Sequence, residues 1–203
     1  MPRPDAEIAE CRASHERLHR SIQALDDEAM RRPSRLPGWT VGHVVTHLAR
    51  NADSVVRRLS AVIDGRIVEQ YEGGPPGRAA EIEAGASRSA AEIYDDLVRA
   101  DDAVDAIFGV VPQEAWERPF ATPNAWAEFQ QRPASFLPFT RWREVETHHV
   151  DLGIGYEFAD WPQTLIDRWL PGLLQDLPDR TDARQLAAWV LGRGTAPALR
   201  DWG

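Results

Sequence analysis

Three pairs of potential metal ligands stand four residues apart in this sequence. The pairs are His15 with His19, His43 with His47, and Glu144 with His148. On an α-helix this spacing places both side chains on one face, about 6 Å apart along the axis. Imidazole and carboxylate groups are common zinc ligands. A site built from cysteines is excluded, because Cys11 is the chain's only cysteine.

The surroundings of the first two pairs differ. Charged residues surround His15 and His19, so we expect a solvated helix face there. His43 and His47 lie among apolar residues, and Asn51 follows one turn later on the same face. Burying an imidazole without a partner is costly, which favours a function for at least one of these two histidines. The alternative is a core histidine bonded to a backbone carbonyl.

The third pair has an acidic neighbour. Glu144, His148 and Asp151 share one helix face at i, i+4 and i+7. Glu144 and His148 facing His43 or His47 would supply the three protein ligands of a catalytic zinc site with an open fourth position. The alternative is a salt-bridged network of Arg141, Glu144 and His148.

Two arginines are candidates for substrate binding. Arg78 and Arg193 could hold a doubly anionic substrate, because guanidinium groups pair bidentately with carboxylates. Arg193 stands between Gly192 and Gly194, which is equally consistent with the end of a helix. Cys11 lies on the apolar face of its helix and is interpreted as a packing residue.

The elements that must position these residues are helical. Apolar spacing and capping residues predict helices over 6–25, from Thr40 into the sixties, over 80–108 as a short and a long helix, and from Phe139 or Thr140 to Leu152. We expect loops at 73–77 and 112–138, and two more helices at 162–177 and 183–191. No stretch shows convincing strand alternation. The prediction is an all-α, antiparallel four-helix bundle over residues 1–158, with a short helical extension over 159–203 that packs on it.

Charge and hydropathy limit the partners. The formal net charge of −9 disfavours a nucleic-acid partner. The N-terminal residues lack an apolar signal core, and no later stretch is long and apolar enough to span a membrane. We expect a cytoplasmic protein, monomeric or homodimeric, that binds small molecules.

Two motifs resemble one known family. LPGWTVGHVVTHLARNAD at 36–53 and TRWREVETHHVDLG at 140–153 resemble the mycothiol-dependent maleylpyruvate isomerases, which belong to the DinB/YfiT-like metal-binding bundles. The stretches RAAEIEAG at 78–85 and RQLAAWVLGRG at 184–194 are similar to the family more loosely. The resemblance implies zinc ligands at His47, Glu144 and His148, and so selects His47 over His43. It further implies that Arg78 and Arg193 act on substrate carboxylates, and we expect Asn51 and Arg193 to contact the thiol cofactor.

The resemblance also implies a reaction. Zinc would bind the thiol of mycothiol as a thiolate, which adds to the cis double bond of maleylpyruvate. Rotation about the new single bond and elimination would then give fumarylpyruvate. Family members carry a small α/β C-terminal domain, whereas residues 161–193 are too few for its strands, which favours the alternative of a thiol S-transferase acting on another electrophile. The second alternative is a non-catalytic metal-binding bundle, in which Asp151 or His43 would close the site as a fourth ligand.

Overall fold

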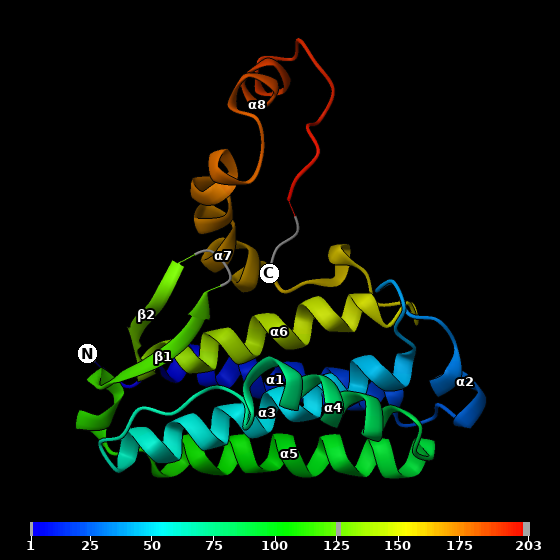
Figure 1. The fold of residues 1–203 in the computed structure, drawn as a ribbon, viewed down its shortest axis with the longest axis vertical. Coiled ribbons are helices and arrows are strands. Elements are labelled where there is room, and N and C mark those ends of the chain that lie inside the picture. The colour runs from blue at the N-terminus through cyan, green and yellow to red at the C-terminus, as the bar shows by residue number, and fades with distance from the viewer. Residues whose placement is uncertain (1, 125–126, 201–203) are drawn as a thin grey trace. The chain divides into compact units, whose positions relative to one another are not determined.

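The computed structural model describes residues 2–124 and 127–200, with side chains for residues 2–120 and 132–200. The predicted all-α class is confirmed. Four long helices lie side by side in Figure 1: α1 (Asp5–Ile22), α3 (Val41–Ile63), α5 (Ala90–Val110) and α6 (Leu137–Asp151). Helices α3 and α1 each pack against both α5 and α6, so the four enclose one core.

The helices of this bundle run in two directions. The antiparallel pairs are α1 with α5 and α3 with α6. Helices α3 and α5 run in the same direction, because α4 (Gly74–Ala86) lies along α3 and returns the chain to the start of α3. The short α2 (Asp27–Arg31) packs against α3 and connects it to α1.

Side-chain caps fix the start of two long helices. The hydroxyl of Thr40 accepts a hydrogen bond from the His43 backbone N–H at 3.4 Å, and the Thr40 N–H donates to His43 Nδ1 at 3.2 Å. Ser89 and Glu92 form the same reciprocal pair at the start of α5. The cap turns the His43 ring back toward the beginning of α3 and away from the residues one turn later.

Helix α4 begins six residues earlier than the sequence suggested. The loop expected at 73–77 is largely the first turn of α4, which starts at Gly74 instead of Ala80. Prolines 75 and 76 fit there because the first turn of a helix needs no N–H donors. Near its end, α4 closely approaches α3, where a Cβ added at Gly85 would lie 2.4 Å from Thr46 Cγ2.

The segment before α6 contains a hairpin that sequence reasoning missed. Strands β1 (Pro119–Asn124) and β2 (Ala127–Pro133) pair antiparallel, with Pro119 opposite Pro133, between the 3₁₀ helices η1 (Gln113–Glu117) and η2 (Ala134–Phe136). Prolines argued against strands here, but a two-stranded ribbon has only edge strands, and these tolerate proline. Trp116 and Phe120 are buried.

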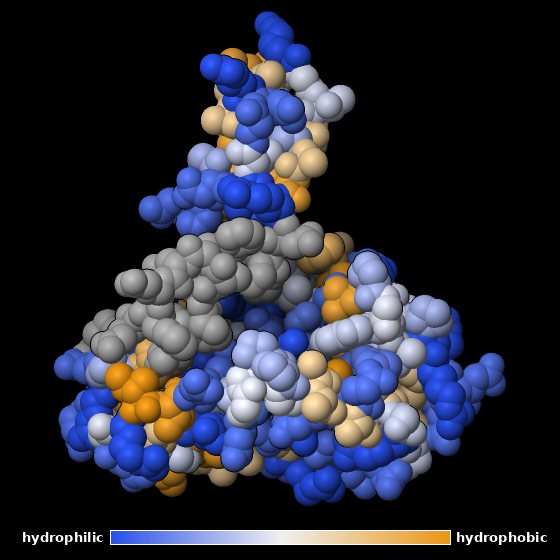
Figure 2. All heavy atoms as spheres, viewed as in Figure 1, coloured by the Kyte–Doolittle hydropathy of each residue, from blue (hydrophilic) through white to orange (hydrophobic). Residues whose placement is uncertain are grey.

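Residues from Ala159 onward form a separate compact unit. It contains most of η3 (Phe158–Asp160), then α7 (Gln163–Asp176), η4 (Leu177–Arg180) and α8 (Ala183–Val190). Within it the rings of Trp161 and Trp169 stack with centroids 5.7 Å apart. Over the described residues, no helix is both long and apolar enough to cross a membrane. Hydrophilic residues dominate the face of the bundle seen in Figure 2.

Candidate metal centre

His47, Glu144 and His148 converge between α3 and α6. The Nε2 atoms of the two histidines are 3.1 Å apart. The Glu144 Oε2 atom lies 3.6 Å from each of these nitrogens. His47 comes from α3, and the one-turn spacing of Glu144 and His148 on α6 presents both side chains to it. The structure therefore brings together the three residues that the resemblance implied as zinc ligands.

The spacing of these three atoms fits a metal ion. Nitrogen and oxygen ligands lie about 2.0–2.2 Å from zinc, so two ligands of a tetrahedral site are about 3.3–3.6 Å apart. The distances of 3.1 Å and 3.6 Å bracket that separation. In the described part of the chain, this is the one group of three such residues close enough to share an ion. Two imidazoles and one carboxylate form a donor set that is common for catalytic zinc.

Neither of the two proposed fourth ligands points into this cluster. Asp151 Oδ2 lies 2.9 Å from Nδ1 of His148, the ring nitrogen that faces away from the cluster. His43 contacts Thr40 and, at 3.3 Å, Oε2 of Glu83. Asp151 is thus placed to accept the Nδ1 hydrogen and orient the His148 ring. Among the described residues, the cluster offers three potential protein ligands, the number that a metal site with an open position requires.

The pKa values of the two histidines in the cluster are shifted in opposite directions. Burial lowers the pKa of His47 to about 4, and the nearby His148 and Arg78 act in the same direction. Burial also opposes the charge of His148, but Asp151 and Glu144 outweigh it and raise that pKa to about 9. Burial would raise the pKa of Glu144, yet the two histidines hold it well below its usual range. An anionic Glu144 and a neutral His47 are the forms that ligate metals.

Arg78 lies beside the cluster and is held by aromatic rings. Its guanidinium carbon is 5.8 Å from the ring centre of Trp39 and 5.6 Å from that of Tyr71. One Nη donates to His47 Nδ1 at 3.1 Å. No carboxylate in the described part of the chain pairs with Arg78, so its charge is available to an anion. Sequence reasoning did not find Trp39, which directly precedes the Thr40 cap of α3, or Tyr71, which lies just before α4. Their contacts with Arg78 form only where α4 packs on α3.

The remaining predicted residues lie elsewhere. Asn51, 4% exposed, accepts a hydrogen bond from Arg141 through Oδ1 at 2.9 Å. Arg193 follows α8 in the second unit and is exposed, so its expected role stays a prediction.

One alternative and one expectation from the sequence were wrong. The alternative of a network that joins Arg141 to Glu144 and His148 does not hold, because the buried Arg141 guanidinium pairs with Asp101 of α5 at 2.6 Å. His15 is not on a solvated face but is 2% exposed, with Nε2 located 3.2 Å from the same Asp101 carboxylate. Asp101 of α5 draws both His15 of α1 and Arg141 of α6 into the core. The sequences of α1 and α6 alone could not reveal this partner.

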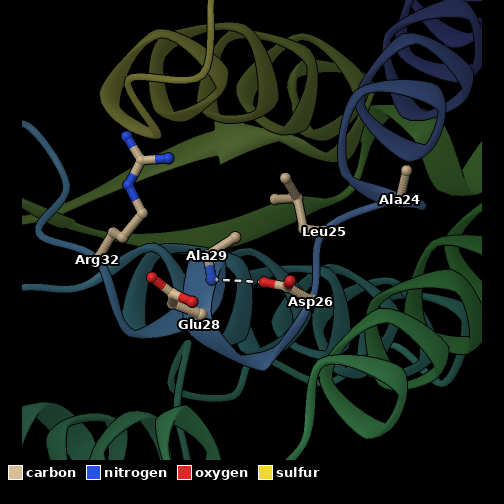
Figure 3. Close-up of a pocket in the computed structure, with 6 residues that line it drawn as sticks. All are labelled: Ala24, Leu25, Asp26, Glu28, Ala29 and Arg32. Carbon is tan, nitrogen blue, oxygen red and sulfur yellow. Dashed lines mark hydrogen bonds between the residues drawn. The ribbon is translucent and has the colours of Figure 1, made fainter.

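A separate surface hollow of about 290 Å³ lies where α1 meets α2 (Figure 3). Its lining residues are Ala24, Leu25, Asp26, Glu28, Ala29 and Arg32. Asp26 accepts a hydrogen bond from the Ala29 N–H and caps α2, as the dashed line shows. The lining contains no histidine or cysteine, and the candidate chemistry therefore belongs to the cluster between α3 and α6.

Comparison with known proteins identifies the family and the fold. Residues 11–153 match the family described as the mycothiol maleylpyruvate isomerase N-terminal domain. A crystal structure of the mycothiol-dependent maleylpyruvate isomerase is similar, with a TM-score of 0.75 at 24% identity, over 82% of this chain and 67% of that one. A mutant of that enzyme, with one histidine replaced by alanine, matches equally well. At this identity the likeness shows the fold. No curated protein sequence matches the chain.

Proposed function

Because the chain belongs to the mycothiol maleylpyruvate isomerase N-terminal domain family, we propose that it converts maleylpyruvate to fumarylpyruvate with mycothiol as the thiol cosubstrate. Zinc is the proposed metal, with His47, Glu144 and His148 as its ligands. The observation that carries the proposal is the cluster of three ligands beside Arg78, a cation without a carboxylate partner among the described residues.

The chemistry requires a thiol from outside the chain. Cys11 is fully buried in α1, so it cannot reach a substrate. Zinc, when bound, would take the thiol of mycothiol in its open position and favour the thiolate at neutral pH. The low pKa of His47 suits this role, because a neutral imidazole can ligate without first losing a proton.

Arg78 would hold a substrate carboxylate during the step in which thiol addition has turned the double bond into a single bond. When Nε2 of His47 is a ligand, its Nδ1 carries the hydrogen, and Arg78 then needs another acceptor. A substrate carboxylate can be that acceptor. The sulfur of mycothiol adds to one carbon of the cis double bond, the resulting single bond turns, and departure of the sulfur restores a trans double bond. The fixed carboxylate keeps the substrate in position while the single bond rotates.

The other assignments are part of the same proposal. Asn51, one turn after His47, can offer its side-chain N–H donors to the thiol cosubstrate, since its Oδ1 is bonded to Arg141. Arg193 is proposed to contribute to thiol and substrate binding from residues 159–203, a shortened extension of the bundle at 1–158. The expected setting is the cytoplasm.

Metal content and thiol-dependent turnover test the proposal together. Purified protein is incubated with maleylpyruvate and mycothiol, and loss of substrate absorbance is followed. We expect His47→Ala, Glu144→Ala and His148→Ala each to remove most of the bound zinc and to lower turnover at least 100-fold. Turnover that persists without thiol would contradict the mechanism, and normal zinc content in one variant would exclude that residue as a ligand.

His43→Ala is the matched control. His43 lies on the same helix one turn before His47, but its ring contacts Thr40 and Glu83. We expect the variant to lose some helix stability through its cap and to keep its zinc. If thiol is consumed with another electrophile while maleylpyruvate is untouched, the protein is an S-transferase and the isomerase proposal fails.

A further inference from the structure

The two histidines of the metal cluster are supported differently. Nδ1 of His148 lies 2.9 Å from the Asp151 carboxylate, whereas Nδ1 of His47 lies 3.1 Å from an Nη of Arg78. A metal-bound imidazole usually donates its second N–H to a carboxylate, a carbonyl or a water, and that bond fixes the ring. Arg78 cannot take this part for His47, because a guanidinium group accepts no hydrogen bond. In the described part of the chain, the orientation of the His47 ring therefore depends on packing.

The ring that packs on His47 is that of Trp39, which is half-buried. The two rings meet edge to face, with centroids 5.7 Å apart and planes inclined by 63°. The Trp39 ring also stacks on His43, with centroids 6.2 Å apart and planes inclined by 28°, and lies 5.8 Å from the guanidinium carbon of Arg78. Edge-to-face pairs at such distances are favourable and restrict rotation of the rings. One indole thus contacts a proposed metal ligand and the cation beside it.

The sequence LPGW determines where the Trp39 ring lies. The Trp39 N–H donates to the Leu36 carbonyl at 3.1 Å and closes a four-residue turn. Pro37 occupies the second position and Gly38, with a φ of +80°, the third, as a type II β-turn requires. The Trp39 carbonyl accepts hydrogen bonds from the N–H and the hydroxyl of Ser34, each at 2.9 Å. The turn therefore fixes the backbone of Trp39 just before α3 begins.

The loop at 33–40, which contains this turn, is also attached to the end of α6. The Arg35 N–H donates to the Asp151 carbonyl at 2.8 Å. The Arg35 guanidinium pairs with both carboxylate oxygens of Glu157, one of them at 2.8 Å. The carboxylate of Asp151 is the group that faces Nδ1 of His148. The loop therefore carries the ring that packs on one proposed ligand and is bonded to the residue that supports the other.

We propose that Trp39 is a positioning residue of the metal centre. It holds the His47 ring in the orientation in which Nε2 faces Glu144 and His148, the place that Asp151 takes for the second histidine. The inference rests on the proposed function, because it takes His47 as a metal ligand. Trp39 itself offers no ligand atom, so its effect on the ion passes through the His47 ring.

Cobalt(II) tests the proposal, because its visible absorption reports the geometry of its ligands. The full chain, freed of metal, is titrated with Co²⁺ alone. We expect Trp39→Leu to bind Co²⁺ about 10-fold or more weakly, with shifted absorption bands, and Trp39→Phe to recover the native bands and most of the affinity. Loss of stability alone would leave the spectrum of the bound ion unchanged. A native spectrum and native affinity in Trp39→Leu would overturn the proposal.

Trp161→Leu is the matched control. It also removes one stacked indole, since the Trp161 ring lies 5.7 Å from that of Trp169, but in the second unit. We expect native Co²⁺ affinity and a native spectrum, and a change equal to that of Trp39→Leu would contradict the proposal.

If Trp39→Leu does not fold, fluorine NMR of the full chain labelled with 5-fluorotryptophan takes its place. The resonance that is absent from Trp39→Phe identifies Trp39. It should shift when Zn²⁺ is added to the metal-free protein, because the His47 ring beside it becomes a ligand. A resonance that stays in place contradicts the proposal.

Turnover separates this inference from the proposed function. If Trp39→Leu alters the Co²⁺ spectrum but the zinc-loaded native protein does not isomerise maleylpyruvate, the isomerase proposal fails and the positioning role of Trp39 stands. If the native protein is an active isomerase and Trp39→Leu keeps the native spectrum and affinity, the reverse holds.

Discussion

The ring of His148 is held from its far side. Its Nδ1 atom lies 2.9 Å from Asp151 Oδ2, one turn later on α6, and this contact turns Nε2 toward His47. A carboxylate in this place fixes which imidazole nitrogen carries the hydrogen and makes the other nitrogen a better ligand. Asp151 is therefore expected to tune the metal site without touching the ion.

Replacement of that carboxylate should weaken metal binding while leaving the ligands in place. We expect Asp151→Asn to lower zinc affinity about 10–100-fold, because the amide cannot accept the Nδ1 hydrogen with the strength of a carboxylate. Competition with a chromophoric chelator measures the change. Asp64→Asn, at the exposed end of α3, is the control and should keep native affinity. Equal affinities in the two variants would show that Asp151 does not support the ligand.

At the scale of elements, the position of Arg78 depends on how closely α4 approaches α3. Gly85 lies against Thr46, and Arg78 stands seven residues earlier on α4, about two turns away. Thr46 in turn precedes His47 directly. A side chain at Gly85 would push α4 outward and carry Arg78 away from the metal cluster.

A double-mutant cycle tests this contact. Gly85→Ala should destabilise the protein by about 1–3 kcal/mol, because its Cβ would lie 2.4 Å from Thr46 Cγ2. Thr46→Ser removes that methyl group, so the double variant should recover at least about 1 kcal/mol relative to the sum of the single variants. Chemical denaturation provides the free energies of unfolding. Additive effects would mean that α4 is positioned by other contacts.

At the scale of the whole bundle, one buried cation ties all four long helices together. Arg141 of α6 donates to Asp101 of α5 at 2.6 Å and to the Leu48 carbonyl and Asn51 of α3 at 2.9 Å. His15 of α1 completes the contacts around Asp101. This network lies one turn before Glu144 on α6 and one turn after His47 on α3, so it holds together the two helices that carry the proposed ligands.

Acid should unfold the bundle partly through Asp101. Burial would raise the pKa of Asp101, but Arg141 and His15 outweigh burial and lower it to about 2. A lowered carboxyl pKa stabilises the fold above the unfolded value of about 4, and this contribution of about 2 kcal/mol disappears as the pH falls through 2. Asp101→Asn should be less stable at pH 7 by about 3–5 kcal/mol, because Arg141 loses its partner.

The pH dependence distinguishes this charge from simple packing. The stability gap between the native protein and Asp101→Asn should narrow between pH 5 and pH 2, as measured by urea unfolding. A gap that stays constant over this range would show that the ionised form of Asp101 is not the stabilising species.

The sequence by itself determined the long helices and two of the three residues of the candidate metal cluster. Glu144 and His148 follow from a one-turn spacing, which any α-helix converts into a shared face. The all-α class follows in the same way from apolar periodicity, because helix formation on this scale depends on local spacing and caps.

Only the tertiary structure decided which residues from different helices meet. The cap formed by Thr40 turns His43 aside, and the antiparallel pairing of α3 and α6 brings His47 to Glu144. Asp101 draws His15 and Arg141 into the core, a contact between three helices that no single segment encodes. The hairpin and the stacking of Arg78 were missed for the same reason, since their energy comes from partners distant in sequence. The spacing of residues determines which side chains share one face of a helix. The packing of the helices determines which residues of other helices contact that face.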